Sequence, residues 1–165
     1  MGRPAFYMRA NTGLFVLVTG SRSWPHIDRI HTALEECLDS VDRLGNGTLT
    51  IMHGGAKGAD TMAGNWAKQA NQDKLAVDWP IVRQARWKQP CRDDPRCKPG
   101  HRRMWADGSS CPMAGYYRNE EMVREALQVR RPVLVLAFIH QKSNGTTHCA
   151  DFARTNGLDV IPFEA

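Results

Sequence analysis

Two uninterrupted apolar runs constrain the fold most strongly. "LFVLVTG" at 14–20 and "PVLVLAFI" at 132–139 are rich in β-branched residues and do not alternate with polar ones. A strand that packs on one face only shows a polar residue at about every second position, whereas a strand covered on both faces reads as a continuous apolar run. Both runs therefore predict strands at the centre of a parallel sheet.

Helical periods alternate with the strands along the chain. From Pro25, apolar residues recur at three- and four-residue steps until "GNG" ends the pattern, which predicts a helix at 25–44. Further strands are predicted at 48–53, 75–82 and 159–163, and further helices at 59–71, at 115–129 and in the segment that ends at 156. Pro80 weakens or ends the third strand. This alternation indicates an α/β fold: a doubly wound, mostly parallel sheet of about five strands with helices on both faces.

Length and composition favour one domain. The chain has 165 residues, of which 42% are hydrophobic and 24% charged, close to the average of soluble globular proteins. We expect a flexible arm at 1–13 and a single domain at 14–165. No apolar run approaches the roughly 20 residues of a membrane helix, and the first residues lack the apolar stretch of a secretory signal. We therefore expect a cytoplasmic protein without a membrane partner.

The charge balance favours an anionic partner. The net charge is +5 and the pI about 9.1. The segment from Arg83 to Arg103 is rich in Lys and Arg and contains only two acids, Asp93 and Asp94. A basic patch of this kind suits nucleic acid, a nucleotide or another phosphate, and charge alone does not select among them.

Four loops beside the strands carry residues that suit phosphate. They are "TGSRSW", "HGGAKGAD", "AGYYRNEEM" and "HQKSNGTTHCAD". Backbone N–H groups, hydroxyls and guanidinium groups bind phosphate at helix N-termini, and ligands of doubly wound sheets lie beyond the carboxyl ends of the strands. The predicted ligand-binding residues are Gly20, Ser21, Arg22, Gly54, Gly55, Lys57, Gly58, Asp60, Arg118, Asn119, Ser143, Gly145 and Thr146.

Each loop taken alone also has a purely structural interpretation. A turn with a helix cap explains "TGSR" and "GTTHCAD", and Asp60 is also typical of a first-turn acid that stabilises a helix dipole. "HGGAKGAD" is not a Walker A loop, and "TGSRSW" lacks the glycines of the dinucleotide fingerprint. His53 either faces the pocket or only caps the glycine loop. Trp24 and Trp87 are candidates for stacking on a purine, while Trp66 fits helix packing.

Five cysteines are present, and three of them lie close together. Cys91, Cys97, His101 and Cys111 form C-x5-C-x3-H-x9-C within a basic insert at 88–113. Three thiolates and one imidazole make a closed tetrahedral ligand set for structural zinc, and a metal would stabilise a segment that has no apolar period. Free or redox-sensitive thiols and a disulfide remain alternatives. The other two, Cys37 and Cys149, fit small core positions on helices.

The loops together resemble one known family. "VTGSRSW", "HGGAKGADTMAGNWA", "AGYYRNEEMV" and "SNGTTHCADFA", in this order, are similar to the YspA-like proteins of the SLOG superfamily, which also includes the LOG phosphoribohydrolases and the DNA-processing protein DprA. The likeness extends over nearly the whole chain from Leu14 onward. It implies a Rossmann-like sheet whose glycine loops form a pocket for nucleotides or nucleotide-derived ligands, and it is compatible with a homodimer.

The LOG enzymes suggest roles for individual residues. In these enzymes a Gly-Gly loop and a Gly-Thr loop hold the phosphate, while an Arg ahead of a Met and a Glu after the Gly-Thr act on the ribose bond. The matching residues here are Gly54, Gly55, Gly145, Thr146, Arg118 and Met122, and the resemblance makes Arg118 the candidate catalytic residue.

The Glu of the LOG pattern is absent from this chain. Its position holds Cys149, although a carboxylate would stabilise the oxocarbenium character of glycosidic bond cleavage. Asp60 or His148 would have to replace it.

Three functions follow from these observations. The leading hypothesis is binding of a nucleotide or nucleotide-derived ligand, for sensing or sequestration. The first alternative is a nucleoside monophosphate phosphoribohydrolase or a related N-glycosidic hydrolase. The second is a nucleic-acid-binding module, based on the basic insert and the likeness to DprA.

Overall fold

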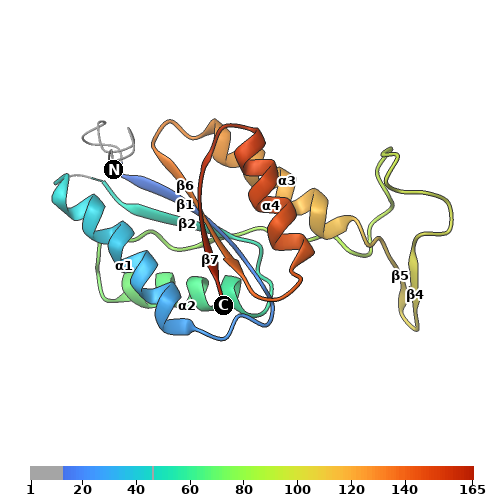
Figure 1. Ribbon diagram of the computed structural model, residues 1–165, viewed down its shortest axis with the longest axis horizontal. Helices are drawn as coiled ribbons and strands as arrows, with labels where there is room; N and C mark the ends of the chain where they lie inside the picture. The colour runs from blue at the N-terminus through green and yellow to red at the C-terminus, as the bar shows by residue number, and fades with distance from the viewer. Residues whose placement is uncertain (1–12, 46) are drawn as a thin grey trace.

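A five-stranded parallel sheet forms the centre of the molecule (Figure 1). The computed structural model describes residues 13–45 and 47–165, so most of the predicted N-terminal arm lies outside the described residues. The strand order is β3-β2-β1-β6-β7, and all four neighbouring pairs are parallel. The strands are β1 (Leu14–Gly20), β2 (Leu49–His53), β3 (Ile81–Val82), β6 (Val133–Ile139) and β7 (Asp159–Glu164). The predicted Rossmann-like α/β fold is confirmed.

Helices cover both faces of the sheet (Figure 1). Helices α1 (Ile27–Arg43) and α2 (Ala59–Gln72) pack on one face. Helices α3 (Ala114–Gln128) and α4 (Asn144–Thr155) pack on the other. In the described ranges, no helix combines the length and apolarity needed to cross a membrane.

The central strand β1 contributes to two separate cores. Val16 and Val18 lie in the core beneath α1 and α2, while Phe15 and Leu17 lie in the core beneath α3 and α4. Each of these side chains is at most 2% exposed. Because successive side chains of a strand point to opposite faces, burial on both faces requires the unbroken apolar run that the sequence shows.

The third strand is shorter than predicted. Only Ile81 and Val82 pair with β2, and Val77 makes an isolated bridge to Leu49. Pro80 lies between these two contacts and has no amide hydrogen to donate, so the ladder is interrupted there.

The insert projects away from the sheet and contains a short hairpin (Figure 1). Strands β4 (Arg103–Trp105) and β5 (Gly108–Ser110) pair in antiparallel register. The sequence gives no sign of this hairpin, because the side chains of β4 are exposed and do not alternate between apolar and polar.

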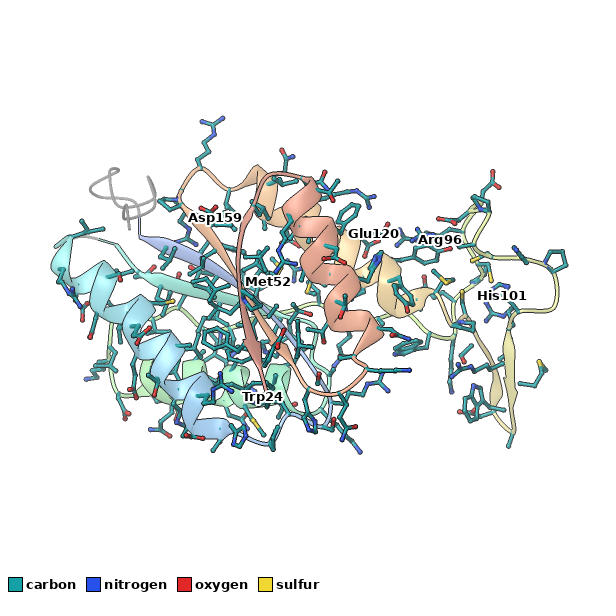
Figure 2. The ribbon with its side chains drawn as sticks, in the orientation of Figure 1. Trp24, Met52, Arg96, His101, Glu120 and Asp159 are labelled. Atoms are coloured by element: carbon teal, nitrogen blue, oxygen red, sulfur yellow. The ribbon has the colours of Figure 1, made fainter. Side chains whose placement is uncertain are left out.

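Trp24 is part of the core, so its predicted role in purine stacking is wrong. It is 2% exposed, its indole ring meets Phe138 edge to face at 5.2 Å, and its Nε1–H donates to the carbonyl of His26 (Figure 2). Trp66 packs partly buried against the same core. The core positions predicted for Cys37 and Cys149 are confirmed, since both are buried.

The sheet reverses its winding direction between β1 and β6. These strands are neighbours, yet the helices that follow them lie on opposite faces, and such a switch point is where doubly wound sheets bind ligands. Ser21 ties the two strand ends together. Its hydroxyl accepts a hydrogen bond from the N–H of His140 at 2.8 Å and donates one to the carbonyl of the same residue at 3.2 Å.

Candidate functional site

A cavity of about 360 Å³ opens at this switch point. Its walls are the loop after β1, the first turns of α3 and the segment from the end of β6 into α4. It brings together most of the predicted ligand-binding residues: Gly20, Ser21, Arg22, Asp60, Arg118, Asn119, Ser143, Gly145 and Thr146. We refer to it as the main cavity.

A second cavity of similar volume adjoins the first and holds most of the remaining predicted residues. Gly54, Gly55 and Lys57 line it, and Arg22 and Arg118 line both cavities.

The structure places Gly58 on neither cavity wall. Gly58 has a positive φ of 78°, and a Cβ on it would collide with the backbone of Ser21 and Arg22. Gly58 therefore allows the start of α2 to pack closely on the loop after β1.

The N–H groups of the glycine loop are bonded within the protein. Those of Gly54 and Ala56 donate to the Asp60 carboxylate at 3.0 and 3.3 Å. That of Gly55 donates to Nδ1 of His53 at 3.0 Å. The loop was expected to offer these groups to a phosphate, but two side chains already accept them. Of the two interpretations of His53, the structure therefore supports the cap.

Burial shifts the pKa of both accepting side chains. It raises the pKa of Asp60 to about 6, although the Arg118 charge and the hydrogen bonds from backbone N–H groups act in the opposite direction. It lowers the pKa of His53 to about 4, and the charges of Lys68 and Arg118 act in the same direction. At neutral pH, His53 is therefore an uncharged imidazole that can accept at Nδ1. Its Nε2 is the sole side-chain nitrogen or oxygen in the described ranges that is buried without a hydrogen-bond partner, and it faces Gly64.

Arg118 reaches from α3 across to the glycine loop. Its guanidinium donates to the carbonyl oxygens of Gly54 and Arg83, and its Nε donates to the side-chain oxygen of Asn119 at 2.9 Å. Desolvation lowers the pKa of Arg118, while the negative charge of Asp60 favours the protonated form. Neutral carbonyl oxygens rather than a bidentate carboxylate hold the guanidinium, so its charge remains available to an anion in the cavity.

Helix α4 begins at the wall of the main cavity without a side-chain cap. Ser143 occupies the N-cap position, but its hydroxyl bonds the hydroxyl of Thr146 at 2.7 Å instead of a backbone N–H. The first intrahelical bond at this end runs from the N–H of Thr147 to the carbonyl of Ser143. The N–H groups of Asn144, Gly145 and Thr146 therefore have no partner within the helix, and all three residues line the cavity.

Three cationic side chains line the same cavity as this helix start. Arg22, Arg118 and Lys142 all line the main cavity, whereas Asp60 is the single acid among the described residues of its wall. The positive end of a helix dipole together with these charges makes an anion-binding environment. Asn119 of α3 connects this helix to α4. Its side-chain amide donates to the carbonyl of Gly145 at 3.0 Å, while its side-chain oxygen accepts a hydrogen bond from Arg118.

Sequence reasoning overlooked some residues of the wall. Tyr116, His140 and Lys142 line the main cavity. All three lie within loops that the sequence had singled out, "AGYYRNEEM" and "HQKSNGTTHCAD". Extending the prediction from the glycines and hydroxyls to every side chain of these loops would have found them.

Cys149, at the position of the LOG glutamate, and His148, a candidate replacement for it, both lie off the wall of the main cavity. Cys149 is fully buried in the core beneath α4, and this burial raises the pKa of its thiol to about 12. The imidazole of His148 lies 3.2 Å from the Glu120 carboxylate and against the ring of Tyr116. Within 13–45 and 47–165, only Asp60 offers a carboxylate to the cavity, and that carboxylate already accepts hydrogen bonds from N–H groups of the glycine loop.

The four predicted metal ligands converge within the insert. The Sγ atoms of Cys91, Cys97 and Cys111 and a ring nitrogen of His101 all lie within 4.8 Å of one another. Nε2 of His101 is 3.4 Å from Cys91 Sγ and 3.2 Å from Cys111 Sγ, and Cys97 Sγ is 3.6 Å from Cys111 Sγ. These separations are close to the ~3.7 Å between sulfur ligands of a tetrahedral site with metal–sulfur bonds of about 2.3 Å.

The imidazole of His101 is oriented as a ligand. Nδ1 is bonded to the carbonyl of Lys98, which directs Nε2 toward the thiols. All the cysteines are free thiols in the structure. The cluster could therefore hold a metal ion.

Two of the four loops, at 19–24 and 53–60, lie in a segment that matches a known protein family. Residues 14–88 match the YspA, cpYpsA-related SLOG family. The Gene 61 protein of Mycobacterium phage D29 is 34% identical over 148 residues, which cover 90% of this chain and 94% of that protein. Among solved structures, the C-terminal domain of a hydrogenase from Pyrococcus furiosus covers 98% of both chains, but its TM-score of 0.39 at 13% identity is too low to carry an argument. Because of the matched segment and the relative that is similar over nearly its full length, the chain belongs to the YspA, cpYpsA-related SLOG family.

Proposed function

We propose that this protein binds a nucleotide or nucleotide-derived ligand in the main cavity, with a phosphate at the start of α4. One observation carries the proposal: α4 opens into the cavity with no side-chain cap, in a wall that also contains Arg22, Arg118 and Lys142. A phosphate would accept the free N–H groups of the first turn and neutralise part of the positive charge around it.

Aromatic side chains suit the other end of such a ligand. Trp87 and Tyr116 both line the main cavity, and Trp87 also lines the second one. Trp87 is 39% exposed, and its indole packs over Gly115, where a Cβ would lie 3.1 Å from the ring. An exposed indole fixed by its edge offers a stacking surface to a planar base. The cavity volume of about 360 Å³ is within the usual range for small-molecule sites.

Binding is better supported than hydrolysis. A phosphoribohydrolase would need a carboxylate at the ribose bond, and Cys149 is both a thiol and buried. The Asp60 carboxylate already accepts hydrogen bonds from two N–H groups of the glycine loop.

Binding of nucleic acid is less well supported, because many basic residues of the insert region form ion pairs. Arg83 pairs with Glu125, Lys88 with Asp107, Arg92 with Glu121, and Arg96 with Asp94 and Glu120. Cations that are already paired release fewer counterions from a phosphate backbone.

We further propose that the cluster in the insert holds a structural zinc ion. Three thiols and one imidazole, with no position left for water or substrate, are typical of zinc that stabilises a fold. Native mass spectrometry of the purified protein is expected to show one zinc per chain. A metal-free protein of unchanged thermal stability would contradict this assignment.

The nucleotide proposal is tested by isothermal titration of the zinc-loaded protein. The titrants are nucleoside mono- and diphosphates together with inorganic pyrophosphate. We expect saturable binding of at least one nucleotide, weakened by Arg118→Ala and unchanged by Met104→Ala at the exposed hairpin. Absence of binding across the whole panel would overturn the proposal. Release of free base by the wild-type protein, lost in Arg118→Ala, would support the hydrolase instead.

A further inference from the structure

The metal cluster lies directly beside one wall of the main cavity. Cys111 lies just before α3, separated from it by Pro112 and Met113, and its carbonyl accepts a hydrogen bond from the N–H of Ala114 at the start of the helix, at 3.1 Å. Pro112, Gly115 and Tyr116, on either side of Ala114, line the cavity. The last metal ligand and the first turn of α3 are therefore parts of one short, continuous segment.

Two contacts extend this connection across space. The N–H of Cys111 donates to the carbonyl of Trp87 at 2.8 Å, which fixes the segment that carries the stacking indole. The Sγ of Cys97 lies 2.7 Å from the hydroxyl of Tyr117, whose neighbours Tyr116 and Arg118 both line the cavity.

The insert has little apolar packing of its own to hold these contacts. Among its described residues, none belongs to either core cluster of the sheet. Met104 and Trp105 of the hairpin are 77% and 57% exposed. The ion pair between Arg96 and Glu120 joins the insert to α3, and His101 lies farther out within the insert (Figure 2). A second ion pair, Arg92 with Glu121, also joins the insert to α3. Partly exposed ion pairs are weak constraints, whereas a bound metal would cross-link four residues.

We propose that metal occupancy of the cluster holds the wall formed by Trp87 and the first turn of α3, and thereby sets the affinity of the main cavity for its nucleotide. The second half of this inference rests on the proposed function. Metal binding and nucleotide binding are then linked, so each ligand strengthens the other by the same factor.

The first test needs no nucleotide. Hydrogen–deuterium exchange is measured on zinc-loaded protein and on the same protein after chelation. We expect faster exchange at 85–90 and at 112–119 after chelation, with no change in α1, which lies on the opposite face of the sheet. Unchanged exchange at 112–119 would overturn the inference. This result stands whether or not a nucleotide binds.

The second test measures the linkage, with adenosine diphosphate as the nucleotide. We expect chelation to raise its dissociation constant roughly tenfold, within the usual range of coupling between two sites. The equilibrium constant for zinc transfer from the protein to a chromophoric chelator should fall by the same factor when adenosine diphosphate is present. Equal affinities of the zinc-loaded and zinc-free proteins would overturn the inference. If neither adenosine diphosphate nor any other nucleotide of the panel binds the zinc-loaded protein while the exchange result above holds, the proposed function is contradicted instead.

Variants distinguish an effect of the metal on the cavity wall from a general loss of folding. His101→Ala removes a metal ligand that does not line the main cavity, and it should weaken nucleotide binding as chelation does. Tyr117→Phe keeps the ring that the guanidinium groups of Arg92 and Arg96 contact, and it removes only the hydroxyl that contacts Cys97. We expect this variant to retain zinc but to show a smaller effect of zinc on nucleotide affinity. Met104→Ala is the matched control, with both affinities unchanged. Full coupling in Tyr117→Phe would contradict the route through this contact.

Discussion

The guanidinium of Arg118 fills the space that a side chain at Gly54 would occupy. A Cβ on Gly54 would collide with Nη1 and Cζ of Arg118, and the same guanidinium donates to the Gly54 carbonyl. The guanidinium can therefore keep this position only while residue 54 has no side chain, independently of any ligand.

Gly54→Ala should destabilise the protein by about 1–3 kcal/mol, as overpacking of a close contact does. Arg118→Ala removes the colliding group, so the double variant should lose less than the sum of the two single losses. Urea denaturation of the four proteins measures the free energies of unfolding. Strict additivity would show that the two residues do not constrain each other.

Gly145→Ala should separate stability from binding. A Cβ on this first-turn residue of α4 would meet nothing within 4 Å, so the fold can accept it. Alanine is favoured over glycine inside a helix by roughly 0.5–1 kcal/mol, and the free energy of unfolding should stay level or rise. The added methyl group projects beside N–H groups that we assign to a phosphate, so nucleotide affinity should fall. Thermal melts and isothermal titration check the two effects, and unimpaired binding would place the anion elsewhere.

Trp87→Ala should weaken the binding of the base without affecting the binding of the phosphate. Its indole is the stacking surface that we assign to the base, whereas the start of α4 is assigned to the phosphate. Adenosine diphosphate should therefore bind at least roughly fivefold more weakly, since stacking is worth about 1–3 kcal/mol per base. Inorganic pyrophosphate should bind as it does to the wild-type protein. Trp105→Ala, on the exposed hairpin, is the control, and an equal loss of both titrants would contradict the assignment.

Asp60 should give the folded protein a measurable dependence on pH. Its pKa is about 6 in the folded protein, against about 3.9 for an unperturbed aspartate. The folded state thus binds this proton more tightly than the unfolded state. The contribution of Asp60 to stability is greatest below about pH 4, declines as pH rises toward 6, and stays low above it.

Asp60→Asn tests this sign. The amide oxygen still accepts from the glycine loop but does not titrate. The wild-type protein should gain stability relative to the variant, by up to about 3 kcal/mol, as pH falls from 7 to 4. Urea denaturation gives the free energy of unfolding of both proteins at each pH. Because both contain His53, the contribution of its titration cancels in the difference between the two free energies. A relative loss of wild-type stability at low pH would show that the folded-state pKa is lowered instead.

The sequence predicted the sheet well because burial on two faces leaves a strong pattern. Leu14–Gly20 and Val133–Ile139 are continuous apolar runs and form the two central strands as expected. The hairpin at 103–110 escaped prediction, since its strands are three residues long and β4 is exposed. Its position depends on contacts within the insert rather than on a local period.

The sequence predicted that the four loops beside the strands converge at one edge of the sheet, but it did not predict their hydrogen bonds, and ligand binding there stays a prediction. Parallel strands bring their following loops to one edge, so the convergence of Arg22, Arg118 and Gly145 follows from the fold class. The direction of an N–H group depends on which side chains accept it, and Asp60 and His53 accept those of the glycine loop. Likewise, the burial of Trp24 depends on how the turn before α1 packs, which no periodicity encodes.

The bonds between Ser21 and His140 join residues 119 positions apart in the sequence. While the chain is being synthesised, β1 emerges early and must wait for β6, and until then one edge of β1 has no partner. Such distant pairing slows folding and exposes an apolar strand edge in the meantime. A fragment that ends before Val133 would keep the glycine loop but would expose one edge of β1. We expect such a fragment mainly to self-associate.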